Sequence, residues 1–217
     1  MKPVTINQLG DWYQEFPSFW ESPGTNNIVK AISSEYQRYK VYPEPQNIFK
    51  AFELCQYKDI KAVILGMDPY NDGNATGLAF GVNTPKINPS LRKIKDAIET
   101  EVYDGLLLEY DYSLEYLARQ GVLLLNSALT VKHGIPGSHM HIWQGFIKSI
   151  LVFISIHKED VQWFLWGKNA QEYKPYIYND TIKMNIFEAE HPAYAARQGR
   201  PWITNNQFKN TKHIIQW

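Results

Sequence analysis

Apolar residues along the chain follow two spacings, which predict helices and strands respectively. Four segments are predicted as helices from their apolar spacing or their ends: 25–39, 89–102, 113–121 and 143–157. Residues 41–52 are predicted as a proline-stiffened turn that leads into a further short helix. We expect Thr25 and Ser90 to cap the first and second of the four segments, because a side-chain oxygen at a helix start can accept a hydrogen bond from the first backbone amides.

Short continuous apolar runs lie between the predicted helices. There are four of them: 61–65, 122–125, 161–166 and 182–189. Strands that alternate with helices predict a parallel sheet covered on both faces. The expected fold class is therefore α/β, with a central four-stranded parallel sheet flanked by helices. No repeat, low-complexity tract or linker interrupts the sequence, so residues 1–217 are expected to form one domain.

Polar residues follow each of the four runs, where ligands of such sheets bind. Asp68, Asn126, Lys168 and His191 come after the first, second, third and fourth run. An acid, an amide and an imidazole would therefore meet at one edge of the sheet. Pro69 disfavours helical backbone at Asp68. The carboxylate then either points into a cleft or caps the following turn, and the residues alone leave both readings open.

Charge is balanced overall but segregated along the chain. Lys plus Arg and Asp plus Glu each number 22, which gives a net charge of zero. Residues 84–95 and 191–217 carry basic side chains and no acid, whereas residues 96–115 carry seven acids and no Lys or Arg. Such segregation allows a basic face on a neutral protein, although an ordinary solvated surface would give the same counts.

Features of the whole chain favour a cytoplasmic protein with no membrane partner. Cys55 is the only cysteine, so no internal disulfide can form and a reducing compartment is expected. The first residues contain no apolar run typical of a secretory signal. The longest apolar stretch, 150–156, is too short to span a bilayer.

Common cofactor and nucleophile motifs do not explain the predicted site. His133, His139 and His141 lie close in sequence but have no carboxylate or thiolate nearby, so no metal site is expected. The chain lacks the phosphate-loop and dinucleotide-binding patterns and a serine on a nucleophile turn. We therefore expect no cofactor. An Asp and a His at a site without a metal or a cofactor suggest bond cleavage through stabilisation of developing charge.

Several motifs occur in a fixed order and cover nearly the whole chain. They are VYPEPQNIFKAF, GMDPYNDGNATGLAFGV, PSLRKI, LARQGVLLLNSALTV, SH, LWGKNAQ, EHP and IIQW. Together they resemble the main, uracil-specific family of uracil-DNA glycosylases. The resemblance implies that family's fold, and hydrolysis of the bond between uracil and deoxyribose after the base leaves the DNA stack. It also implies a monomer acting on single- and double-stranded uracil-containing DNA, with DNA-mimicking glycosylase inhibitor proteins as further partners.

The same resemblance gives each residue of the pocket a task. Asp68 would orient the attacking water and stabilise the cationic sugar, and His191 would hydrogen-bond the uracil oxygen that gains negative charge. A helix expected after His191 would favour its neutral form. Asn126 would accept from uracil N3–H and donate to O4. Phe80 would stack on the base unless it only packs in the core, and Tyr70 would exclude the methyl group of thymine.

Further contacts are implied outside the base pocket, and several depart from the family pattern. The expected DNA contacts are Ser90 (at a helix start), Ser138, His139, Lys168, Tyr194, Ala195, Arg197 and Arg200, and the backbone amide of Met67 is expected to bind uracil. Met67, Asn71 and Lys168 replace the usual glutamine, histidine and serine. The leucine that the family inserts into the base stack aligns with Ala195. Tyr194 or an arginine would have to replace it, so we expect a preference for single-stranded DNA and U·G mismatches.

Two other functions fit the residues less well. A glycosylase for a broader range of damaged bases conflicts with Tyr70 and Asn126, because both sharpen selection for uracil. A non-catalytic DNA-binding relative, acting in replication or assembly, would not need Asp68, Asn126 and His191 together.

Overall fold

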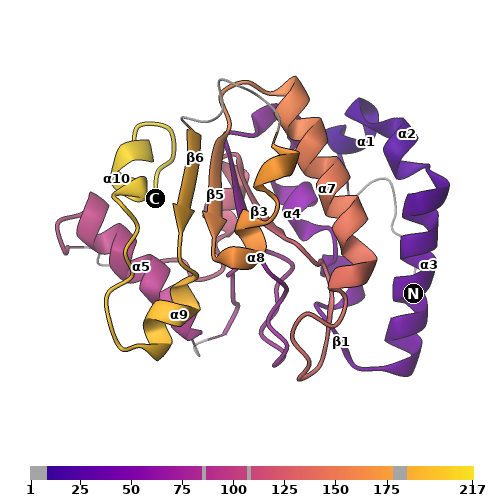
Figure 1. The fold of residues 1–217 in the computed structure, drawn as a ribbon, viewed down its shortest axis with the longest axis horizontal. Helices are drawn as coiled ribbons and strands as arrows, with labels where there is room; N and C mark the ends of the chain where they lie inside the picture. The colour runs from indigo at the N-terminus through magenta and orange to yellow at the C-terminus, as the bar shows by residue number, and fades with distance from the viewer. Residues whose placement is uncertain (1–8, 85–86, 107–108, 178–184) are drawn as a thin grey trace.

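The centre of the molecule is a parallel sheet (Figure 1). The computed structural model describes residues 9–84, 87–106, 109–177 and 185–217. The sheet has the order β3-β2-β5-β6 and consists of β2 (Ala62–Gly66), β3 (Val122–Asn126), β5 (Gln162–Trp166) and β6 (Ile186–Ala189). All neighbouring pairs are parallel. The predicted four-stranded sheet is thus confirmed, although residues 182–184 of the fourth apolar run lie outside the described ranges.

Helices cover the sheet on both sides. They are α1 (Asp11–Glu15), α2 (Pro17–Trp20), α3 (Pro23–Arg38), α4 (Lys50–Leu54), α5 (Pro89–Val102), α6 (Glu115–Arg119), α7 (Met140–His157), α8 (Lys168–Gln171), α9 (Pro192–Arg197) and α10 (Gln207–Thr211). In Figure 1, α3 and α7 lie to one side of the strands, and α5, α9 and α10 lie to the other. This arrangement confirms the α/β class.

Both predicted helix caps are wrong, because the helices begin earlier than their apolar pattern. Ser22 caps α3, and its Oγ accepts from the amide of Thr25 at 3.1 Å. Ser90 lies inside the first turn of α5 and is buried. Pro23 and Pro89 occupy the first helical positions, where the fixed φ of proline suits a helix and its missing N–H costs nothing.

A small antiparallel pair was not predicted. It joins β1 (Val41–Tyr42) to β4 (Val131–Lys132). Two-residue strands carry too little pattern to be recognised in a sequence. The pair matters for the site because it anchors residues 133–138, the turn that follows β4. The His133 amide strengthens this anchor by donating to the Lys40 carbonyl at 2.8 Å.

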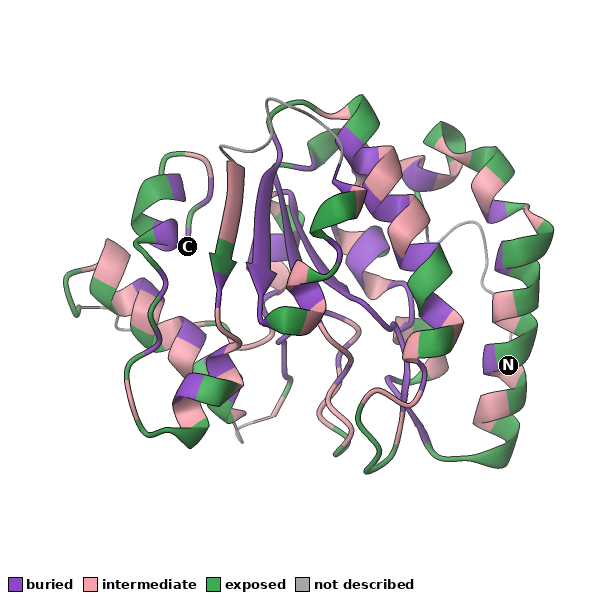
Figure 2. Ribbon diagram, viewed as in Figure 1, coloured by how far each residue is buried: buried purple, intermediate pink, exposed green. Residues whose placement is uncertain are grey.

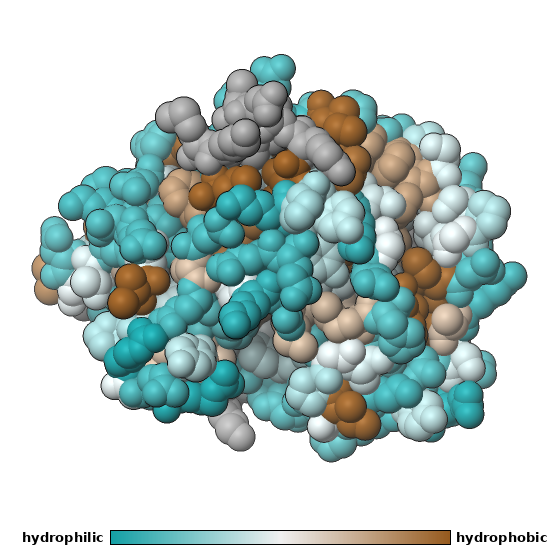
Figure 3. All heavy atoms as spheres, viewed as in Figure 1, coloured by the Kyte–Doolittle hydropathy of each residue, from teal (hydrophilic) through white to brown (hydrophobic). Residues whose placement is uncertain are grey.

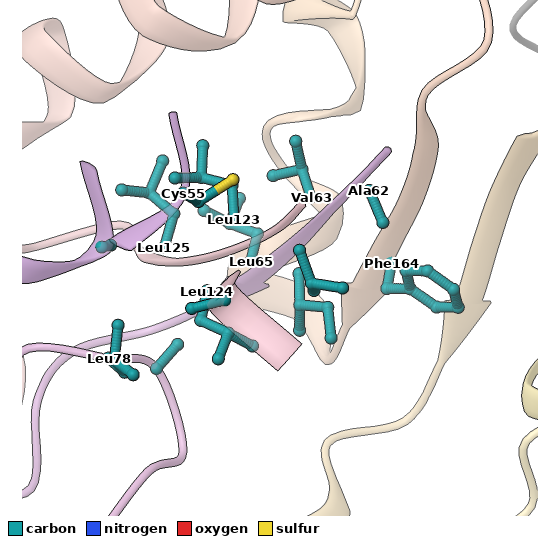
Figure 4. Close-up of a cluster of buried hydrophobic side chains, with 14 of the residues drawn as sticks. Cys55, Ala62, Val63, Leu65, Leu78, Leu123, Leu124, Leu125 and Phe164 are labelled. Carbon is teal, nitrogen blue, oxygen red and sulfur yellow. The ribbon is translucent and has the colours of Figure 1, made fainter. Parts of the chain in front are cut away.

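The core holds the carboxyl ends of the strands in place. Strands β2, β3 and β5 are buried along their whole length, whereas β6 is partly exposed (Figure 2). On one face of β5, the ring of Phe164 lies 5.4 Å from that of Trp217, and Trp166 lies 4.8 Å from Trp202. Figure 4 shows another part of the same core, in which aliphatic side chains of β2 and β3 gather with Cys55, Leu78 and Phe164. Burial of this apolar surface is the main force that stabilises such a platform.

Among the described residues, no helix is both long and apolar enough to cross a bilayer. The face in Figure 3 is mostly hydrophilic, and its apolar residues form small separate groups.

Candidate active site

A pocket of about 230 Å³ opens at the carboxyl edge of the sheet. Its walls come from the segments after β2, β3 and β6 and from the start of α5. The lining residues are Met67, Asp68, Pro69, Tyr70, Asn71, Leu78, Phe80, Ser90, Asn126, Pro136, His191 and Ala193. The structure therefore brings together the acid, the amide and the imidazole that sequence position had placed at one edge.

Asp68 is held by a segment far away in the chain. Its Oδ2 accepts from the Gly137 amide at 2.6 Å, so the carboxylate reaches across the pocket to the 133–138 turn. Burial raises the pKa of Asp68, and the hydrogen bond from Gly137 opposes that rise. The site thus holds a carboxyl group whose charged form is poorly solvated.

His191 lies at the start of α9 in a defined protonation state. Its Nδ1 accepts from the Ala193 amide at 3.1 Å. A ring nitrogen that accepts a hydrogen bond carries no proton, so the neutral imidazole carries its proton on Nε2 and can donate from there. Burial, and then the charge of Arg197, lower the pKa of His191. The helix expected after this residue is confirmed as α9.

Two glycines make room for the polar side chains of the pocket. Gly66 of β2 pairs with Asn126 of β3, and a Cβ on Gly66 would lie 2.3 Å from Asn126 Oδ1. The amide therefore lies across the space that a side chain would fill. Gly167 has a φ of +89°, and its added Cβ would lie 2.7 Å from the Cβ of His191. Any larger residue at either glycine would displace a polar side chain of the pocket.

The aromatic wall of the pocket is fixed by backbone and hydroxyl contacts. Phe80 has a φ of +66°, a conformation that is rare for a bulky residue and is often found at functional sites. Its ring lies 5.8 Å from His191. The Tyr70 hydroxyl donates to the Phe80 carbonyl at 3.3 Å and lies 3.0 Å from Ser90 Oγ. Burial raises the pKa of Tyr70 to about 12, so the phenol stays neutral. Ser90, expected at a phosphate, is therefore engaged inside the pocket.

Ser138 and His139 are both tied into the protein. The Lys132 amide donates to Ser138 Oγ at 2.9 Å. His139 is only 1% exposed; its Nδ1 lies 2.8 Å from Thr130 Oγ1 and its Nε2 lies 3.2 Å from Glu35 Oε2. Its imidazole thus has no free nitrogen to offer a phosphate or a metal. Within the described ranges, no three His, Cys, Asp or Glu side chains come together as metal ligands would.

Helix α9 contains the position that aligns with the leucine inserted by the family. Ala195 of this helix is fully buried, and α9 as a whole packs against α5. Tyr194 is 47% exposed on the same helix, and Arg197 is also exposed. Arg200 donates to both oxygens of Glu190 at 2.6 Å, and its guanidinium lies 5.8 Å from the Tyr194 ring.

Some residues at the pocket were missed because their contribution does not depend on a reactive side chain. Gly137 acts through its backbone amide, and Leu78, Pro136 and Ala193 contribute only shape. No sequence signal identifies them, since turns and cores use the same residue types. Lys168 was predicted, and it lies exposed at the first position of α8.

Comparisons with known proteins agree with this geometry. The model of the uracil DNA glycosylase superfamily matches residues 52–216. A uracil-DNA glycosylase from Borrelia duttonii is 41% identical over 195 residues, covering 87% of this chain and 85% of the relative. Its counterpart from Flavobacterium johnsoniae is 35% identical over 216 residues, covering 98% and 96%.

Solved structures show the same fold. The mimivirus uracil-DNA glycosylase has a TM-score of 0.76 at 22% identity, covering 88% of this chain and 72% of that protein. A variant of it, with the same TM-score, was solved in complex with UGI. Because the family model spans most of the chain and the curated relatives match along nearly their whole length, the chain belongs to the uracil-DNA glycosylase superfamily.

Proposed function

We propose that this chain is a uracil-DNA glycosylase, which hydrolyses the N-glycosidic bond of deoxyuridine in DNA. The products are free uracil and an abasic site, which base excision repair then processes. The observation that carries the proposal is the pocket of about 230 Å³ in which Asp68, Asn126 and His191 meet. The family assignment supports the same reaction.

Bond breaking moves charge in two directions, and the pocket has a group for each. As the bond between C1′ and N1 lengthens, negative charge develops on the uracil and positive charge on the sugar. His191 donates from Nε2 to uracil O2, where such a donor stabilises the developing anion. Asp68 stabilises the sugar cation through its negative charge. Its Oδ2 is bound to Gly137, so we assign the orientation of the attacking water to Oδ1. The water oxygen bonds to C1′ as the bond between C1′ and N1 breaks, its proton passes to Asp68 Oδ1, and uracil departs with the bonding electrons.

Selection for uracil comes from the remaining walls. The Asn126 amide accepts from N3–H and donates to O4, whereas cytosine presents the opposite pattern at these two atoms. Phe80 stacks on the base, and the backbone amide of Met67 adds a donor. Tyr70 stands against C5 and excludes the thymine methyl. Ser90 supports this filter, because its Oγ lies 3.0 Å from the Tyr70 hydroxyl.

DNA is held beside the pocket by α9. Since Ala195 is buried, we assign the wedge in the base stack to Tyr194, the exposed aromatic residue of that helix. Arg197 contacts phosphate from the same helix. Arg200 forms an ion pair with Glu190, so its charge is less available to a phosphate. Its guanidinium lies 5.8 Å from the Tyr194 ring, and we assign it the role of supporting that ring. A tyrosine lacks the compact shape of leucine, and the enzyme therefore favours single-stranded DNA and U·G mismatches, whose bases unstack at lower cost.

Other partners follow from the same surface. Ser138 and the exposed Lys168 complete the phosphate contacts. Inhibitor proteins that mimic DNA would bind this edge, as UGI binds the mimivirus relative. Helix α3 packs on α7 although it precedes the region matched by the family model, which supports one domain over residues 1–217. We also propose that the protein acts as a monomer. The buried free thiol of Cys55 fits a reducing cytoplasm.

The test compares four bases in one sequence context. Oligonucleotides carrying uracil, thymine, hypoxanthine or cytosine are incubated with the protein, and abasic sites are cleaved with alkali and counted. Release of uracil alone supports the proposal. Release of hypoxanthine as well would indicate a broader glycosylase, and DNA binding without any release would indicate a non-catalytic relative.

A further inference from the structure

A chain of hydrogen bonds links residues on both sides of the 133–138 turn, and none of its members lines the candidate pocket. Trp143 Nε1 donates to Thr130 Oγ1 at 2.7 Å, and Thr130 Oγ1 lies 2.8 Å from His139 Nδ1. His139 Nε2 lies 3.2 Å from Glu35 Oε2, and Lys132 Nζ lies 2.7 Å from the same oxygen. Trp143, Thr130 and His139 are buried.

Only one assignment of donors and acceptors gives every proton of these hydrogen bonds an acceptor. An indole N–H only donates, so Thr130 accepts from Trp143 and gives its own hydroxyl proton to His139 Nδ1. His139 then carries its proton on Nε2 and donates it to Glu35. Burial lowers the pKa of His139, which keeps the ring in this neutral form. The chain thus fixes both the orientation and the tautomer of the imidazole.

The same imidazole is close in sequence to the amide that holds the proposed catalytic carboxylate. His139 comes two residues after Gly137, whose N–H donates to Asp68 Oδ2 at 2.6 Å. Lys132 lies at the other end of the turn and is bound to the same carboxylate of Glu35. Glu35 therefore holds both ends of the turn that presents the Gly137 amide.

We propose that Glu35 is a positioning residue for Asp68. By fixing His139 and Lys132, it keeps the Gly137 amide on Oδ2 and leaves Oδ1 aimed at the attacking water. Glu35 belongs to α3, which precedes residue 52, where the match to the family model begins. The inference rests on the proposed function and extends the active site to the N-terminal helices.

The first test compares three variants. Glu35→Ala removes the carboxylate, Glu35→Gln keeps an oxygen for His139, and Glu99→Ala is the matched control. Glu99 and Lys95 are 25% and 21% exposed, close to the 19% and 23% of Glu35 and Lys132. We expect Glu35→Ala to lower kcat for uracil release by about tenfold, because small misplacements of reacting groups are costly. KM should stay within about twofold, Glu35→Gln should restore most of kcat, and Glu99→Ala should match the parent.

The second test asks whether the effect passes through Asp68. In an Asp68→Ala background, adding Glu35→Ala should lower kcat by less than about a further twofold, because the carboxylate that Glu35 positions is gone. An equal loss in both backgrounds, or a folded Glu35→Ala with the parent's kcat, would overturn the inference. If Glu35→Ala does not fold, Thr130→Val breaks the chain at its other end, and the same outcomes apply. A parent that releases no uracil would instead overturn the proposed function, and this inference with it.

Discussion

Replacing Gly66 with alanine is expected to displace Asn126. The added Cβ would lie 2.3 Å from Asn126 Oδ1, whereas ordinary contact begins near 3.4 Å. The amide oxygen must therefore retreat by about 1 Å, the difference between these distances. Gly66 does not have the positive φ that would strain an alanine. The Cβ of Ala79 would lie 3.2 Å away on another side, so the backbone has little room to absorb the change.

A displacement of this size is expected to lower activity strongly. Misplacing a binding group by about 1 Å can cost about 10²-fold in rate, so kcat/KM for uracil release should fall by about that factor. Discrimination against cytosine should fall with it, because the amide no longer meets N3 and O4. Single-turnover release from matched oligonucleotides measures both, and thermal unfolding shows whether the variant is folded.

The control is a glycine with no neighbour to displace. An added Cβ at Gly145 of α7 would meet nothing within 4 Å. Gly145→Ala should keep the parent's activity and should be more stable by about 0.5–1 kcal/mol, since glycine disfavours a helix interior. If folded Gly66→Ala releases uracil at the parent's rate, Asn126 does not read the base from this position and the proposed recognition fails.

Four further predictions address the other groups of the pocket. Asp68→Asn should lower kcat by about 10² or more while the thermal midpoint at pH 7 stays equal or rises. Burial raises the pKa of Asp68 in the folded state, so ionising this carboxyl costs stability as pH rises past that pKa; a lower midpoint would contradict this. Burial lowers the pKa of His191, so its charged form should appear only in acid, below the usual range of an imidazole. In the parent, kcat should fall in acid as His191 becomes charged, and this part of the fall should be absent from His191→Ala. Identical pH profiles of kcat for the parent and His191→Ala would refute the role of His191. Tyr70→Ala should release thymine, and a folded variant that leaves thymine intact would remove Tyr70 from the filter. Tyr194→Ala should slow release from U·A duplex more than from single strands, and equal slowing would exclude it as the wedge.

Much of the fold and the polar core of the site could be predicted because both depend on local pattern. The buried parallel strands β2, β3 and β5 are continuous apolar runs, as strands covered on both faces are. Their carboxyl ends share one edge, so Asp68 and Asn126 were located by position alone. His191 was located in the same way, although the start of the fourth apolar run lies outside the described residues.

Other predictions failed because sequence position does not tell which way a side chain points. Ala195 aligns with a residue that the family inserts into DNA, yet it is fully buried in α9. Ser90 was predicted to cap a helix, yet it lies inside the first turn of α5, where its Oγ is 3.0 Å from the Tyr70 hydroxyl. Glu35 and His139 are 104 residues apart, so no local pattern could link them.

The glycines show why a list of reactive residues is an incomplete description of this site. Side chains on neighbouring parallel strands lie side by side, so Asn126 can fold back over β2 only if position 66 has no side chain. The same holds for His191 and Gly167, because a Cβ atom added to Gly167 would overlap the Cβ of His191. These glycines hold no ligand, yet they fix the donors before a base enters, and preorganised donors are what stabilise developing charge. At Gly167 the positive φ of +89° would add backbone strain to any overlap. A loss of activity after a substitution at Gly167 would therefore have two causes, backbone strain and displacement of His191. A substitution at Gly66 adds no strain from a positive φ, so it tests the position of the Asn126 amide more directly.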